Sequence, residues 1–170
     1  MTIELTQRQF CTTISLDQVN QTVTLAGWVD TIRDHGQLLF MHLRDRSGVI
    51  QIVFNPEENK PLHEQAEKLR SEYCVGLTGI VIERADDAKN PHLPTGMLEI
   101  HVSSLDLFNK AQTPPFLISE KSLVDDEPQE FHVDEDLRLT YRYLDLRRLS
   151  MQKNIVIRHK IMSTIRNYLD

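Results

Sequence analysis

Residues 22–54 read TVTLAGWVDTIRDHGQLLFMHLRDRSGVIQIVF, and this stretch decides the fold. Apolar residues alternate with other residues on both sides of the turn at residues 45–48, as in a β-hairpin with one buried face. If the hairpin pairs symmetrically about that turn, His42 faces Gln51 and Phe40 faces Val53. Phe40 and Gln51 are then diagonal neighbours on the outer, solvent-facing side of the sheet.

This outer pair indicates a kind of ligand. A flat ring beside an amide can stack an unpaired nucleobase and hydrogen-bond to its edge. Both side chains must stand together outside the apolar interior for this to work. The hairpin therefore favours single-stranded nucleic acid as the ligand.

The wider pattern predicts five strands and one helix. Strands are expected over about residues 22–33, 37–44, 49–54, 75–84 and 97–103, with a bend or bulge at Gly27. A helix over about residues 61–73 would begin with Pro61 in its first turn. Three strands, a helix and two strands is the order of the oligonucleotide/oligosaccharide-binding (OB) barrel. An immunoglobulin-like sandwich would need about seven strands and no such helix.

Charge divides the chain into three parts. Residues 1–108 form the predicted mainly β, five-stranded OB-fold domain. Residues 109–136 form a proline-containing acidic linker with eight acidic and two basic residues. Residues 137–170 carry eight basic and two acidic residues and a helical apolar pattern that runs to Asp170 without a capping residue. We expect this C-terminal helix to be the first segment of a truncated further domain.

Composition narrows the class of protein. The net charge of −6 argues against a nonspecific polyanion binder, although a few local arginines can still bind RNA. Cys11 and Cys74 follow no metal-ligand spacing, which favours free thiols in a reducing cytoplasm. The sequence shows no apolar run of membrane-spanning length, so a cytoplasmic protein without a membrane partner is expected.

Four motifs carry a resemblance to a known family: Gly-Trp-Val at 27–29, Leu-Arg-Asp-Arg-Ser-Gly at 43–48, Pro-Thr-Gly at 94–96 and Tyr-Leu-Asp-Leu-Arg-Arg at 143–148. In this order they resemble the N-terminal anticodon-binding domain, the hinge and the start of the catalytic domain of bacterial aspartyl-tRNA synthetases of class II. The resemblance implies an aspartate–tRNA ligase that uses ATP and magnesium, with tRNA as partner and a homodimeric parent enzyme.

The catalytic motifs of that family are expected beyond Asp170. The sequence shows no phosphate-binding glycine loop, metal cluster or nucleophile–base pair. We therefore expect this chain by itself to be inactive, monomeric and without a cofactor, and we assign no catalytic or metal-binding residue.

The resemblance also implies roles for individual residues. Phe40 matches the ring that stacks on the central uracil of the anticodon, and Arg33 matches the arginine that meets the third base. Gln51 matches the residue that reads the wobble base, with Glu99 accepting a hydrogen bond from the same base. Each could instead be an ordinary surface residue of a strand.

Three further positions belong to the predicted site. Arg84 and Asn90 lie in the segment after the fourth strand, which borders the anticodon in relatives. In the family, histidine at the position of His35 goes with enzymes that also charge the tRNA for asparagine. Thr31, Ile32 and Ile82 stand where relatives have basic residues, so we expect weaker binding and a shallower salt dependence.

Other arginines are given structural roles. Arg44 and Arg46 flank a tight turn, where stabilising the turn is at least as good an interpretation as phosphate contact. The remaining cluster consists of Arg138, Arg142, Arg147 and Arg148. These arginines could contact the tRNA near the hinge, form ion pairs with the acidic linker or lie at the dimer interface of the parent enzyme, and we favour the two structural roles.

Two other functions stay open. A free-standing OB-fold module for single-stranded nucleic acid would explain the hairpin but not the basic helix after Arg148. An asparaginyl- or lysyl-tRNA synthetase would share the motif at 43–48, but not the one at 143–148.

Overall fold

The computed structural model describes residues 3–118 and 132–169, which divide into two compact units, Met1–Thr113 and Pro114–Asp170. The domain boundaries at 108 and 136 stay predictions. Most of the expected linker, residues 119–131, lies outside the described residues.

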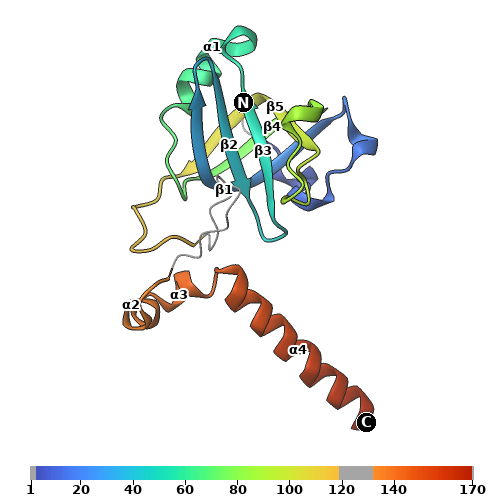
Figure 1. Cartoon of the computed structure of the whole chain (residues 1–170), viewed down its shortest axis with the longest axis vertical. Coiled ribbons are helices and arrows are strands. Elements are labelled where there is room, and N and C mark those ends of the chain that lie inside the picture. The colour runs from blue at the N-terminus through green and yellow to red at the C-terminus, as the bar shows by residue number, and fades with distance from the viewer. Residues whose placement is uncertain (1–2, 119–131, 170) are drawn as a thin grey trace. The chain divides into compact units, whose positions relative to one another are not determined.

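The first unit is a closed five-stranded barrel with the strand order β1-β2-β3-β5-β4 (Figure 1). Helix α1 follows β3 in the chain, so the predicted OB-fold is confirmed. The strands and the helix are β1 (Thr22–His35), β2 (Leu38–Arg44), β3 (Val49–Phe54), α1 (Pro56–Ala66), β4 (Cys74–Glu83) and β5 (Leu98–Asn109). Short 3-10 helices are η1 (Leu5–Gln7), η2 (Cys11–Thr13), η3 (Leu16–Gln18) and η4 (Asp86–Ala88).

The hairpin of β2 and β3 has the predicted register. His42 pairs with Gln51, Phe40 with Val53 and Arg44 with Val49. Met41 and Ile52, on the inner face, are fully buried in the barrel core. Outer-face Val53 is also buried, which the alternating pattern did not predict, and its ladder partners on the two sides are Phe40 and His101.

The carboxylate of Asp45 sets the turn of this hairpin. Its Oδ1 accepts hydrogen bonds from the backbone nitrogens of Ser47 at 2.7 Å and Gly48 at 3.1 Å, and from Ser47 Oγ at 2.6 Å. Its Oδ2 accepts from the backbone nitrogen of Cys11 at 2.8 Å. Burial raises the pKa of Asp45, but these hydrogen bonds outweigh it and leave the pKa below its usual value.

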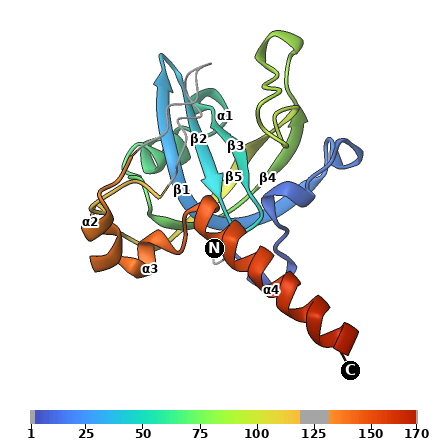
Figure 2. The same cartoon turned by 60° about the horizontal axis from the view of Figure 1, so that its bottom comes forward.

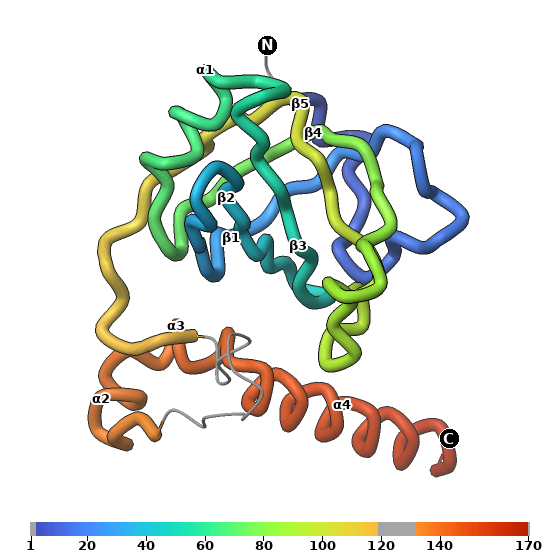
Figure 3. Tube along the Cα trace, turned by 45° about the horizontal axis from the view of Figure 1, so that its top comes forward, coloured from blue at the N-terminus to red at the C-terminus, as the bar shows by residue number. Residues whose placement is uncertain are grey.

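The N-terminal segment, dark blue in Figure 3, is attached to the barrel at several points. Gln9 forms a bridge with Leu25, the backbone nitrogen of Thr12 donates to Ser47 Oγ at 3.1 Å, and that of Asn20 donates to the Val81 carbonyl at 2.8 Å. This segment therefore holds β1, β4 and the β2–β3 turn together.

Strand β1 closes the barrel by changing its partner. Its first half, up to Trp28, pairs with β4, and from Trp28 onward it pairs with β2 (Figure 1). The irregularity in register lies between Val29 and Thr31, three residues after the predicted bulge at Gly27. Gly27 is needed at this corner for another reason, because a Cβ there would lie 2.4 Å from the carbonyl oxygen of Arg44.

Helix α1 differs from the prediction at both ends. It begins at Pro56, where the Asn55 side chain accepts from Glu57 N, and it is kinked at Asn59. The Asn59 side chain then accepts from Leu62 N, so Pro61 does lie in the first turn after the kink. The helix ends at Ala66 rather than at residue 73, and the residues up to 73 form turns that still place Leu69 in the core.

Within its described residues, the second unit forms three helices where one helical pattern was expected (Figure 2). They are α2 (Glu135–Thr140), α3 (Arg142–Asp145) and α4 (Leu149–Leu169). The helical conformation is interrupted at Tyr141, which has a non-helical backbone, and again between Asp145 and Leu149. No helix in the described ranges is both long enough and apolar enough to span a membrane.

Asp145 holds these helices together. Its side chain is fully buried, and its carboxylate is paired with Arg138, Arg142 and Arg148. Burial raises the pKa of Asp145, but the hydrogen bond from Arg138 and the three positive charges have a larger, opposite effect. The pKa therefore lies below its usual value, and the carboxylate stays ionised. These three arginines therefore pair with Asp145 within the second unit, while pairing with the acidic linker and a place at a dimer interface stay predictions.

We predict that Gly27→Ala lowers the free energy of unfolding by about 1–3 kcal/mol, because the new methyl group meets backbone that cannot move aside. Urea denaturation followed by circular dichroism measures the change.

Gly36→Asn is the matched control. Gly36 has a φ of +72°, which asparagine tolerates, and no atom lies within 4 Å of the position that a Cβ would take. Equal stability of Gly27→Ala and the unaltered chain would contradict the close strand crossing.

Candidate nucleic-acid interface

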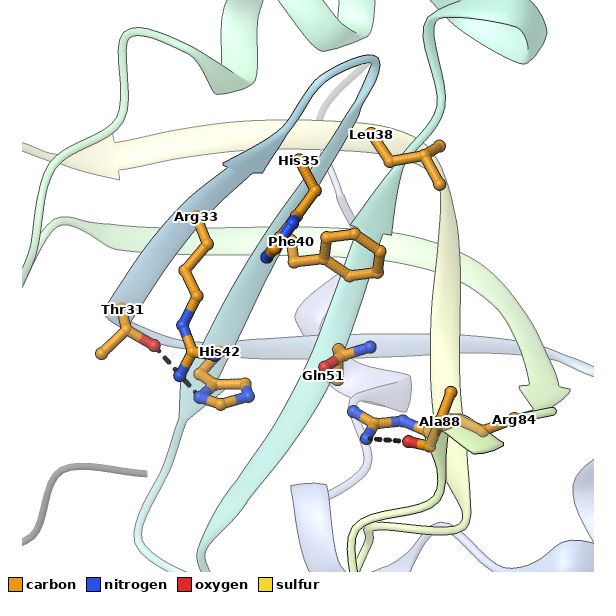
Figure 4. A pocket seen from close by; sticks show the side chains of 9 residues that line it. All are labelled: Thr31, Arg33, His35, Leu38, Phe40, His42, Gln51, Arg84 and Ala88. Atoms are coloured by element: carbon orange, nitrogen blue, oxygen red, sulfur yellow. Dashed lines mark hydrogen bonds between the residues drawn. The ribbon is translucent and has the colours of Figure 1, made fainter. Parts of the chain in front are cut away.

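A cavity of about 470 Å³ opens on the outer face of the barrel beside the β2–β3 hairpin (Figure 4). Its volume lies within the usual range for small-ligand pockets. Side chains of β1, β2 and β3 and of the segment after β4 surround it. The lining residues are Thr31, Arg33, His35, Leu38, Phe40, His42, Gln51, Arg84 and Ala88.

Phe40 and Gln51 stand on the same side of the sheet and both line the cavity (Figure 4). The ring of His35 meets that of Phe40 edge-on, with centroids 5.8 Å apart and an angle of 79° between the planes. Such a contact contributes about 0.5–1.5 kcal/mol and limits the orientations of the ring. The Phe40 face is therefore held ready for a flat partner.

Two guanidinium groups bring unused hydrogen-bond donors to this cavity. Arg84 is only 6% exposed, and its Nη1 donates to the Ala88 carbonyl at 3.2 Å. Among the described residues, Arg84 Nε and Nη2 and Arg33 Nη2 are buried without a hydrogen-bond acceptor. An unsatisfied buried donor costs about 1–3 kcal/mol, so a ligand with acceptor oxygens or nitrogens would be stabilised here.

His42 forms the floor between these arginines. Its Nδ1 lies 3.0 Å from Thr31 Oγ1, and its side chain is 7% exposed. Burial, together with the charges of Arg33 and Arg84, lowers the pKa of His42 to about 4 against an opposing effect of Asp30. The imidazole is therefore neutral at physiological pH and adds no charge to the cavity.

The pairing of β3 with β5 also places Gln51 beside Glu99. The two residues are partners in the parallel ladder of β3 and β5, and Gln51 Nε2 donates to Glu99 Oε2 at 2.9 Å. Burial raises the pKa of Glu99, but hydrogen bonds from His101 and Gln51 and the charge of Arg84 lower it below its usual value. Glu99 is therefore an ionised acceptor behind Gln51.

Five of the seven predicted site residues line the cavity: Arg33, His35, Phe40, Gln51 and Arg84. Glu99 lies behind Gln51, at hydrogen-bonding distance from it. Asn90 lies outside the lining because its side chain accepts from His92 N at 2.9 Å and its backbone pairs with Gly96.

Four lining residues were not predicted as site residues, namely Thr31, Leu38, His42 and Ala88. His42 shares the outer strand face with Phe40, and this position was its one sequence signal. Ala88 carried no signal, because it contributes to the cavity through the course of the chain after β4.

The arginines of the hairpin turn lie outside the cavity lining. Arg44 Nε donates to Asp30 Oδ1 at 2.9 Å, and its Nη2 donates to Glu72. The guanidinium of Arg46 stacks over the Phe10 ring, with its carbon 4.4 Å from the ring centroid. Both contacts are structural, although neither is made to the turn that the two residues flank.

The barrel and its polar, aromatic cavity define a class of protein, and comparison with known families gives the same class. Residues 23–108 match the family described as "OB-fold nucleic acid binding domain". The chain belongs to this family. Residues 134–170 match a second family, described as "tRNA synthetases class II (D, K and N)".

Individual relatives carry more specific names. The chain is 47% identical to the aspartate–tRNA(Asp/Asn) ligase 1 of Syntrophus aciditrophicus over 99% of its own length and 24% of the relative. It is 43% identical to the aspartate–tRNA ligase of Staphylococcus epidermidis, over 95% of this chain and 26% of the relative. The chain thus spans about a quarter of the length of these relatives.

A solved structure supports the fold. The aspartyl-tRNA synthetase of Entamoeba histolytica superposes with a TM-score of 0.81 at 23% identity. The match covers 95% of this chain and 37% of the other.

The buried neutral state of His42 predicts a dependence of stability on pH. Its pKa is about 4 in the folded chain and 6.5 in an unfolded one, so the unfolded state takes up the proton first as pH falls. His42 should therefore destabilise the barrel by about 2 kcal/mol between about pH 7 and pH 5. The His42→Gln variant should not show this fall in the free energy of unfolding. Urea denaturation followed by the fluorescence of Trp28 measures it.

Comparison of the variant with the unaltered chain isolates His42 from other groups, such as His101, whose pKa is raised. His92→Gln, at an exposed position in the loop between β4 and β5, is the matched control. The interpretation fails if His42→Gln and the unaltered chain lose the same stability over this range.

Proposed function

We propose that the cavity binds the bases of a tRNA anticodon and that this barrel is the anticodon-reading part of an aspartate–tRNA ligase. One observation carries the proposal. A supported aromatic ring, an oriented amide, the buried guanidinium of Arg84 and the half-buried guanidinium of Arg33, both with unused donors, line the same cavity. Splayed single-stranded bases offer the flat faces and hydrogen-bonding edges that suit these groups.

The proposed roles follow from the positions of the side chains. Phe40 stacks on the central base, and Gln51, held by Glu99, reads the edge of the wobble base. Arg33 and Arg84 donate to acceptors on the third base or on the neighbouring backbone. Two arginines supply little charge, so binding should depend on salt only weakly for an RNA-binding site.

The names of the relatives support the activity of the whole protein. The full-length protein would attach aspartate to tRNA in the cytoplasm, with ATP and magnesium. Within residues 3–118 and 132–169, no group of three or more His, Cys, Asp or Glu residues is placed to hold a metal ion. No step that uses ATP or magnesium is assigned to these residues.

We further propose that the tRNAs for aspartate and asparagine are both accepted. Their anticodons, GUC and GUU, differ only at the third base. His35 lines the cavity and supports Phe40, and several relatives are named for both tRNAs. A site that tolerates either pyrimidine at the third position would explain the shared name.

Phe40→Ala should weaken binding of the aspartate anticodon stem-loop by about tenfold, because stacking on an aromatic ring is worth about 1–3 kcal/mol per base. Fluorescence anisotropy with a labelled stem-loop measures the affinity. Phe10→Ala is the matched control, since it removes a ring that stacks with Arg8 and Arg46 outside the cavity. Unchanged affinity of Phe40→Ala would refute base stacking on this ring.

Stem-loops with the anticodons GUC and GUU should bind the unaltered chain with comparable affinity. His35→Leu should shift the preference toward GUC. Competition between the two RNAs in one titration gives the ratio directly. A large preference of the unaltered chain for GUC would rule out the dual specificity while leaving anticodon binding intact.

A further inference from the structure

A line of hydrogen-bonding groups runs from helix α1 to the cavity behind β3 and β5. His101 Nε2 lies 3.1 Å from Glu99 Oε1, and His101 Nδ1 lies 3.5 Å from Glu58 Oε1 on α1. Glu99 Oε2 in turn accepts from Gln51 Nε2 at 2.9 Å. The order is therefore Glu58, His101, Glu99 and Gln51.

The chemistry of each group fixes the direction of the next. An ionised carboxylate only accepts hydrogen bonds, so each nitrogen that faces Glu99 must carry a proton. Gln51 therefore has to present its amide nitrogen to Glu99. Its amide oxygen is left on the side of His42, toward the cavity, as Figure 4 shows.

We propose that His101 is a positioning residue for base recognition: by occupying one oxygen of Glu99, it holds the other against the Gln51 amide nitrogen and keeps the Gln51 oxygen directed at the bound base. This inference rests on the proposed anticodon function and adds a residue outside the cavity lining. It also changes the role of Glu99, which supports Gln51 from behind.

The chemistry of the target base follows from this orientation. An amide oxygen accepts but does not donate, so it favours a base that presents an N–H group at that edge. Guanine has such groups at N1 and at its 2-amino nitrogen. Adenine has an acceptor at N1, no 2-amino group and its only donor on this edge at the 6-amino nitrogen, so an amide oxygen that faces N1 and the 2-amino position selects guanine over adenine.

The surroundings of His101 favour its protonated form. Carboxylates face both ring nitrogens, Glu99 from its own strand and Glu58 from α1, while Arg84 acts on the far side of Glu99. The cross-strand neighbours Val53 and Ile80 are uncharged. The hydrogen bond to Glu99 raises the pKa of His101 above its usual value, against the effect of burial. As pH rises through that value, the two carboxylates compete for one remaining N–H group.

The test compares binding of two stem-loops that carry guanine or adenine at the first anticodon position. His101→Leu should lower the preference of the full chain for guanine by about fivefold, the effect of about one neutral hydrogen bond. His101→Gln keeps an amide donor near the Nε2 position and should retain the preference. The unaltered chain should lose preference as pH rises through the raised pKa of His101, and His101→Gln should not.

The outcomes separate the two proposals. If the unaltered chain binds neither RNA, anticodon recognition itself is wrong. If it prefers guanine and His101→Leu has the same preference, or weakens both RNAs equally, the positioning role is overturned. Urea denaturation of each variant shows whether the barrel remains folded, and His92→Leu serves as the control for an exposed histidine.

Discussion

The hydrogen bonds accepted by Asp45 fix the register on which the rest of the barrel face depends. One oxygen closes the turn between β2 and β3, and the other holds the N-terminal segment at Cys11. Side chains alternate across a strand, so a slip of one residue in one strand would turn its outward side chains into the core. The same register sets Gln51 beside Glu99 on β5. A single carboxylate thereby determines which groups can meet a ligand.

The cavity differs from a merely polar surface because its groups are held from behind. Phe40 is supported by His35, Gln51 by Glu99, and His42 by Thr31. Because these side chains are already held in place, less side-chain conformational entropy is lost when a ligand binds. In contrast, Arg33 Nη2 and Arg84 Nε and Nη2 have no hydrogen-bond acceptor among the described residues, so the charge of Glu99, 3.7 Å from Arg84 Nε, offsets their desolvation only in part until a partner binds. The site therefore combines side chains of fixed orientation with buried hydrogen-bond donors that a ligand can satisfy.

The sequence predicted what short-range periodicity controls. The β2–β3 register, the span of β3, the order of the strands and α1 along the chain and the shared face of Phe40 and Gln51 are confirmed. It did not predict the end of α1 at Ala66, because Leu69 continues the apolar pattern from a turn. It also missed Ala88 as a lining residue and did not show that Asn90 lies outside the lining, since the course of the chain after β4 depends on contacts such as the backbone pairing with Gly96. Long-range contacts of this kind leave no periodic trace.

The attachment of the N-terminal segment matters for anyone who excises this domain. The matched family begins at residue 23, and a recombinant protein trimmed to that point would retain all five strands. It would nevertheless lose the Cys11 amide that occupies one Asp45 oxygen and the Thr12 amide that donates to Ser47. It would also lose Cys11 and Ile14, whose side chains pack in the barrel core. We therefore expect such a shortened product to be less stable and to hold its hairpin tip more loosely than the longer chain.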